Sequence, residues 1–119
     1  MKKFKANGKE GVNLLCGLKD GSPFRVYRVL RKIKDAFVDD LHFHPKGYEY
    51  YYVIKGRIVI NLSDKDITVN TNELLCVEPK EKHKVVSVKK DCGVIIIRNE
   101  FSINDKISVD NTRWDLNND

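Results

Sequence analysis

Short runs of alternating apolar and polar residues, separated by turn-forming residues, cover most of the chain. The run 57–62, R-I-V-I-N-L, has the period of two that a half-buried strand shows, and the run 48–54 is rich in tyrosine. Polar turns at 55–56, 63–66 and 71–73 divide these runs. We therefore predict strands at residues 24–33, 36–44, 48–54, 57–62, 67–69, 74–77, 83–88 and 93–98.

This series of short, regularly spaced strands predicts an all-β fold, a sandwich or a barrel. One alternative is a helix over residues 26–38, because several apolar residues between Val26 and Ile33 could form one stripe. The many β-branched residues in this segment favour a strand instead.

The chain of 119 residues has the size of one domain, since domains most often have about 100–150 residues. We assign residues 1–119 to a single domain, with a barrel core spanning residues 20–100 and a C-terminal tail at 101–119. The tail is polar, but it contains the only tryptophan, Trp114. Together with Ile107 and Val109, Trp114 could anchor the tail on the barrel or on a second subunit.

The net charge of +5 raises the question of a nucleic-acid partner. Acidic residues lie among most of the lysines, and no helix-turn-helix, zinc-finger or RNA-binding motif is present. No apolar run reaches the roughly 18 residues of a membrane span, and no signal-peptide core follows the basic start. We expect a cytoplasmic protein with neither a nucleic-acid nor a membrane partner.

The cysteines, Cys16, Cys76 and Cys92, are widely separated and form no C-x-x-C pair. This spacing argues against a zinc ribbon or a redox motif. Cys76 lies in the apolar run 74–77, so we expect a buried and inert thiol there.

The only three histidines are placed where one metal ion could bind all of them. His42 and His44 are two residues apart, so they share a face if their segment is a strand. Glu49 lies on the next predicted strand and His83 begins a later one, so hairpins could bring both opposite the first pair. Three imidazoles and one carboxylate suit a divalent transition metal.

The predicted strand 48–54 has two different faces. Glu49, Tyr51 and Val53 share one of them, so a Glu49 that points into the barrel places Tyr51 near the metal. The other face is more apolar than a solvated face requires, which favours an oligomer interface. That face consists of Tyr48, Tyr50, Tyr52 and Ile54.

The spacing of these residues resembles the cupin superfamily. Its first motif has His-x-His, three or four residues, a glutamate, six residues and a glycine. The segment His42-Phe43-His44 with Glu49 and Gly56 matches that motif.

The second cupin motif has a glycine, five residues, Pro-x-Gly, two residues and a histidine. Residues 72–83 keep this length and end on the required histidine, but they depart from the motif inside it. Asn72 and Lys80 stand for its two glycines, and Glu78 stands for its proline. Ala36 stands for the glycine that precedes the first motif.

The resemblance implies a double-stranded β-helix, which is a jelly-roll barrel with a metal inside. It implies Fe, Mn, Zn or Ni as the cofactor, with one or two coordination positions left for water or substrate. It also implies a small-molecule ligand and, as is common among cupins, a homodimer. The implied metal ligands are His42, His44, Glu49 and His83.

We interpret the chain as a small metal-dependent enzyme, a dioxygenase or an isomerase, that acts on a sugar, a keto acid or a diketone. Tyr51 is the candidate catalytic residue. Arg98, at the end of an apolar run, is preferred over Arg25 and Arg28 as the substrate-binding residue. Because fold does not fix reaction in this superfamily, two alternatives stay open. They are a non-catalytic binding or sensor module, and an isomerase or epimerase that uses a histidine–tyrosine pair without a metal.

Overall fold

The computed structural model describes residues 1–17, 20–33, 40–99 and 106–109. These ranges contain ten β-strands, and none of their segments forms a helix able to cross a membrane. The strands are β1 (Gly11–Cys16), β2 (Arg25–Arg31), β3 (His42–Phe43), β4 (Glu49–Lys55), β5 (Arg57–Leu62), β6 (Lys65–Asn70), β7 (Leu74–Val77), β8 (His83–Val88), β9 (Cys92–Arg98) and β10 (Ile107–Ser108).

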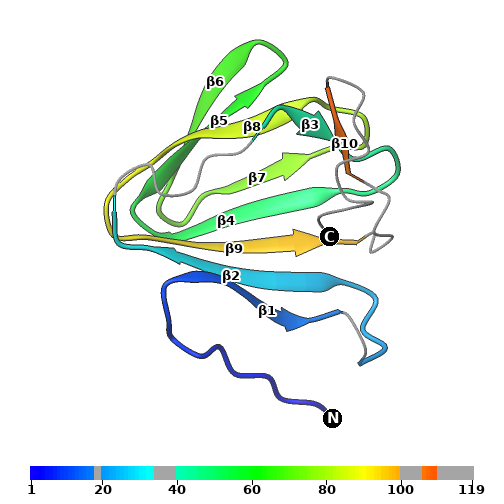
Figure 1. The fold of residues 1–119 in the computed structure, drawn as a ribbon, viewed down its shortest axis with the longest axis vertical. Coiled ribbons are helices and arrows are strands. Elements are labelled where there is room, and N and C mark those ends of the chain that lie inside the picture. The colour runs from blue at the N-terminus through cyan, green and yellow to red at the C-terminus, as the bar shows by residue number, and fades with distance from the viewer. Residues whose placement is uncertain (18–19, 34–39, 100–105, 110–119) are drawn as a thin grey trace.

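Two five-stranded sheets make up the fold (Figure 1). The first has the order β1-β2-β9-β4-β7, and the second has the order β10-β3-β8-β5-β6. All neighbouring strands are antiparallel. From β3 to β9 the chain crosses repeatedly between the sheets, as in a jelly roll. The predicted all-β jelly roll is confirmed.

The inner faces of the sheets enclose the apolar core. In β4, Glu49, Tyr51 and Val53 are buried while the alternate residues face outward, so the predicted orientation of this strand is confirmed. The core consists of Val29, Tyr51, Val53, Ile58, Ile60, Val69, Val77, Val85, Val88, Cys92, Val94 and Ile96.

The turn between β5 and β6 is shorter than the predicted turn at residues 63–66. Ser63 and Asp64 have φ values of 50° and 68°, and Leu62 pairs directly with Lys65. Positive φ at both central residues is typical of a type I′ turn, whose twist matches that of the flanking strands. Two turn residues are therefore enough, and β6 begins at Lys65 instead of residue 67.

Two edge strands were not predicted. β1 pairs with β2, and its apolar residues Val12 and Leu14 are exposed, so the usual amphipathic signal is absent. β10 pairs with β3 and thereby anchors part of the tail on the barrel, through Ile107. Trp114 lies outside the described residues.

The helix alternative for residues 26–38 is wrong where the structure describes them, because β2 pairs with both β1 and β9. Of the predicted strand 36–44, only β3 is found, and residues 36–39 lie outside the described ranges.

The prediction of a buried Cys76 is also wrong. Cys76 is an exposed free thiol. The alternation of β7 directs Val77 into the core and Leu74 outward with Cys76. Cys76 is exposed because it lies on the outer face of the first sheet, opposite the face that packs on the core. An apolar run alone therefore did not indicate which of its residues are buried.

Candidate metal centre

Three histidines and one glutamate meet between the two sheets. His42 in β3 pairs directly with His83 in β8, whereas Glu49 begins β4 of the opposite sheet. His44 follows β3. One ligand atom of each residue lies within 4.8 Å of those of the others, and all four residues are buried. The tertiary structure thus brings together the four predicted residues in a cluster that could hold a metal ion.

The Glu49 carboxylate contacts both its cluster partners and their surroundings. Its Oε1 lies 3.0 Å from His83 Nε2 and 3.5 Å from His44 Nε2. The Tyr51 hydroxyl donates a hydrogen bond of 2.7 Å to the same oxygen. Oε2 lies 3.8 Å from Arg98 Nε.

The Glu49 carboxylate is ionised at neutral pH. Burial alone would raise the pKa of Glu49, but the contacts with His44 and His83 outweigh it and hold this pKa well below its usual value. A carboxylate must be ionised to bind a metal, so Glu49 is in the required state.

Backbone carbonyl groups orient two of the imidazoles. Nδ1 of His42 lies 2.8 Å from the carbonyl oxygen of Asp40, and Nδ1 of His83 lies 2.9 Å from that of Glu81. Because a carbonyl oxygen only accepts, each Nδ1 donates, and the lone pair of a neutral ring is on Nε2. Metal-bound histidines commonly have such a partner. Burial, followed by the charge of His83, lowers the pKa of His42 to about 3, so His42 stays neutral.

The surroundings of His83 provide a direct test of whether a metal fits. Its Nδ1 donates to the carbonyl of Glu81, while its Nε2 faces the ionised carboxylate of Glu49. With acceptors at both nitrogens, either the ring is doubly protonated or another cation lies between Nε2 and the carboxylate. A divalent metal ion meets this requirement and would also bind the other two imidazoles. The donor set therefore fits a metal.

Two residues that replace glycines of the second motif adopt the backbone conformation that glycine favours. The φ angle is 69° at Asn72 and 72° at Lys80. The Lys80 backbone N–H donates to the carbonyl of His44 at 2.8 Å, and that of Asn72 donates to Val53 at 2.7 Å. The loop between β7 and β8 is thus fixed against His44 despite the substitutions.

Both further candidates from the sequence lie beside Glu49. Tyr51 is buried and contacts the carboxylate directly. Arg98 pairs with Glu49 across β4 and β9, and it is buried as well. Their positions fit the expected roles, which stay predictions.

Arg25 was a weaker candidate in the sequence, and the structure gives it greater weight. It pairs with Arg98 across β2 and β9 and is buried, whereas Arg28 is on the other face of β2. The alternation of β2 does place Arg25 and Val29 on one face. The pairing with β9 could not be read from that alternation.

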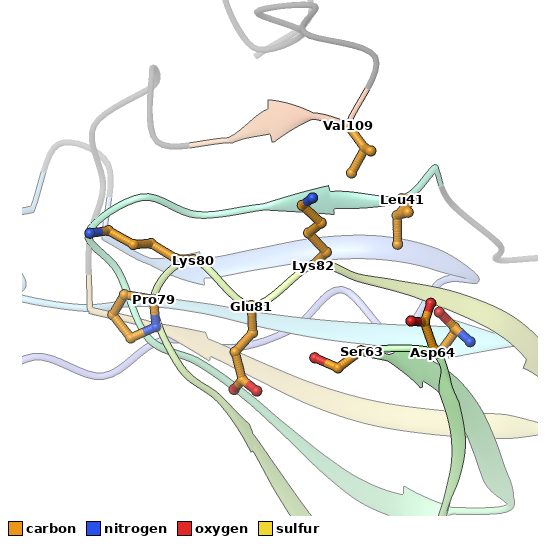
Figure 2. Close-up of a pocket in the computed structure, with 9 residues that line it drawn as sticks. Leu41, Ser63, Asp64, Pro79, Lys80, Glu81, Lys82 and Val109 are labelled. Carbon is orange, nitrogen blue, oxygen red and sulfur yellow. The ribbon is translucent and has the colours of Figure 1, made fainter.

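A separate cavity of about 590 Å³ lies outside the cluster (Figure 2). In Figure 2 the side chains of Lys80 and Lys82 point away from that of Glu81. None of the four cluster residues lines it, so this cavity is distinct from the candidate metal centre. Its lining residues are Leu41, Asn61, Ser63, Asp64, Pro79, Lys80, Glu81, Lys82 and Val109.

A family model of the cupin domain matches residues 33–97, which is more than half of the chain. The chain belongs to the cupin family. The matched region of this cupin includes all four cluster residues. No curated protein matches the chain.

Solved structures share the fold at low sequence identity. Pac13 from Streptomyces, described as a nucleoside dehydratase, is 21% identical over 92% of this chain and 91% of its own, with a TM-score of 0.65. A cupin-2 domain protein from Shewanella frigidimarina is 22% identical over 76% and 81%, with a TM-score of 0.58. KdgF from Halomonas is 16% identical over 82% and 84%, with the same TM-score. At these identities the similarity shows the fold alone.

Proposed function

We propose that this cupin is a small metal-dependent enzyme, a dioxygenase or an isomerase, that acts on a polar oxygenated molecule such as a sugar, a keto acid or a diketone. The observation that carries the proposal is the four ligand atoms within 4.8 Å of one another. The ionised Glu49 and the neutral, oriented His42 support it, because each is in the form that binds a cation.

Fe, Mn, Zn and Ni all accept imidazole and carboxylate ligands. The proposed ligands are His42, His44, Glu49 and His83, and they come from separate segments, so the complete ligand set exists only in the folded chain. On a five- or six-coordinate ion, these four ligands would leave one or two positions for a substrate oxygen. When bound, such an ion supplies Lewis acidity, or O₂ chemistry in the case of iron.

Tyr51 is the proposed catalytic residue. Its hydroxyl donates to Glu49 Oε1, so it can hold or return a proton at the edge of the cluster. Arg98 is the proposed substrate-binding residue, because its guanidinium group lies on the other side of the same carboxylate. The burial of all these side chains keeps water away and strengthens their electrostatic interactions.

A metal-free reaction is a second candidate, and the hydrogen bonds from Tyr51 and His83 to Glu49 favour it. A hydroxyl, a carboxylate and an imidazole in contact can accept and return a proton without a metal. Pac13, which is similar in fold, is a nucleoside dehydratase whose structures include complexes with uridine. This similarity makes a nucleoside or another sugar derivative a useful probe for the second candidate.

Elemental analysis of protein purified without added metal, followed by a turnover screen of metal-loaded and stripped protein, tests both candidates. We expect stoichiometric metal and turnover only in the loaded form. Glu49→Gln should reduce metal affinity by at least about 100-fold, because a neutral amide replaces a charged ligand. Glu78→Gln makes the same change at an exposed side chain and is the matched control.

Full turnover by the stripped protein would favour the metal-free candidate. Unchanged metal affinity in Glu49→Gln would contradict the proposed ligand set. Binding of a metabolite without any product would favour the non-catalytic sensor alternative.

We also propose a homodimer that uses the outer face of β4 and β7. The Tyr48 and Tyr50 rings stack there with centroids 6.5 Å apart, and Leu74 is 58% exposed. An apolar outer face of this kind is typical of an interface. Light scattering should show a dimer for the native chain and a monomer for Leu74→Glu. A monomeric native chain would contradict this assembly.

We propose a cytoplasmic location and a small-molecule ligand, without nucleic-acid or membrane partners. Three free cysteines, one of them exposed, suit a reducing compartment. The interspersed acidic residues give no continuous basic surface along the sequence. Cell fractionation should find the protein in the cytosolic fraction, and recovery with membranes would contradict the proposal.

A further inference from the structure

A row of three charged residues crosses the inner face of the first sheet and begins at Glu49, one of the proposed metal ligands. Glu49 of β4 pairs with Arg98 of β9, and Arg98 pairs in turn with Arg25 of β2. Their exposed fractions are 6%, 9% and 4%. One buried carboxylate is thus followed by two buried guanidinium groups.

The row places two guanidinium groups at directly opposed positions of β2 and β9. Arginine stays charged in proteins, and like charges directly opposite each other destabilise a sheet. Glu49 interacts with Arg98 only through a contact of 3.8 Å, and its other oxygen faces the histidines and Tyr51. Burial makes the charges more costly, since they lose their contact with water.

The Arg98 side chain also has unused donor capacity. Its Nη2 is buried and has no hydrogen-bond partner among the described residues. A buried donor without a partner costs free energy in the unliganded protein. A ligand that accepts hydrogen bonds at this position would remove that cost. A guanidinium group matches a carboxylate particularly well, because both are planar and can form two parallel hydrogen bonds.

We propose that Arg98 and Arg25 form a carboxylate-binding subsite next to the metal centre. The ligand would then carry a carboxylate in addition to the oxygen that binds the metal, so a keto acid is favoured over a neutral sugar or diketone. This inference rests on the proposed metal-dependent function. The burial of both arginines favours a compact carboxylate over a bulkier anion.

Arg98 could orient Glu49 instead of binding a ligand carboxylate. A substitution of Arg25 distinguishes these two explanations. Arg25 is one strand further from Glu49 than Arg98 is. Loss of its guanidinium group should therefore leave metal affinity nearly unchanged. If the pair binds a carboxylate, the same change should weaken anion binding strongly.

The test uses calorimetric titration of the Mn(II)-loaded full chain with malonate and succinate. Each is compared with its monoamide, malonamate or succinamate, in which a neutral amide replaces one carboxylate with little change in shape. We expect at least one dicarboxylate to bind about 10–100-fold more tightly than its monoamide. Arg25→Gln should abolish this preference at unchanged metal content. Arg28→Gln, on the other face of the same strand, should retain it.

Two results would overturn the subsite: no preference for either dicarboxylate in the native chain, or the same preference in Arg25→Gln. If circular dichroism shows that Arg25→Gln does not fold, Arg25→Lys replaces it, and its loss of the planar fork should still reduce the preference. Metal content is measured in every sample. A native chain that binds no metal contradicts the proposed function, whereas a metal-loaded chain without the preference contradicts the subsite alone.

Discussion

The two ends of the barrel interior are built by the same strands but differ in chemistry. β4 runs from Glu49 at the polar end to Val53 at the apolar end, and the antiparallel β9 runs from Val94 to Arg98 beside it. Apolar burial contributes about 25 cal/mol for each Å² removed from water. Buried charges cost free energy unless they are paired. The apolar end therefore stabilises the barrel, and the polar end depends on that stability to keep its side chains close together.

The largest expected effect is at the apolar end. Ile58 is buried and pairs with Val69 and Val88, so Ile58→Ala should lower the free energy of unfolding by about 2–5 kcal/mol. Metal affinity of the folded protein should change little. Urea unfolding and metal titration measure the two quantities. Val59→Ala, at the next position on the outer face, is the control, and a larger loss there would contradict the comparison.

Lowering the pH should reduce the stability of the metal-free protein through the titratable groups at the polar end. The pKa of His42 is lowered to about 3 in the fold, so below its usual value of 6.5 only the unfolded chain takes up this proton. The free energy of unfolding should then fall, as pH drops from 6.5, by up to about 1.4 kcal/mol per pH unit. Glu49, whose pKa is lowered, adds a loss below its usual 4.5.

Urea unfolding between pH 7 and pH 5 in the presence of a chelator measures this dependence. His42→Gln should flatten the curve in that range, because it removes the group whose pKa differs most clearly between the two states. Equal slopes for the native chain and His42→Gln would mean that other groups cause the acid sensitivity.

The smallest expected effect on stability comes from a comparison of one tyrosine on each face of β4. Tyr51→Phe removes the hydroxyl that donates to Glu49 and should lower the free energy of unfolding by about 1 kcal/mol. The same change should also reduce turnover at least about tenfold. Tyr52→Phe is the control, since its hydroxyl makes a longer, exposed contact with Asn72. Equal turnover in both variants would remove Tyr51 from the catalytic machinery.

Local patterns in the sequence were sufficient for much of the fold. The bounds of β5, β7 and β8 match the predicted runs, because alternation over a few residues determines which side chains can share a buried face. The same rule placed Tyr51 beside Glu49. The motif spacing selected all four residues that meet in the cluster.

Local patterns did not predict the exposure or backbone conformation of residues that depend on contacts with segments distant in sequence. Cys76 is in an apolar run but lies on the outer face of its sheet, opposite the core. β1 has little amphipathic character and forms because β2 offers it a free edge. Asn72 and Lys80 adopt positive φ angles because hydrogen bonds to Val53 and His44 fix their loops.

The sequence by itself determined that the chain forms a β barrel and that three histidines and a glutamate belong together. Only the tertiary structure decided that Arg25 lies beside Arg98 and that both extend the row from Glu49. The physical reason is that the direction of a side chain follows from its own strand, whereas its neighbour across the sheet follows from long-range register. That register is fixed only when both sheets pack around the core.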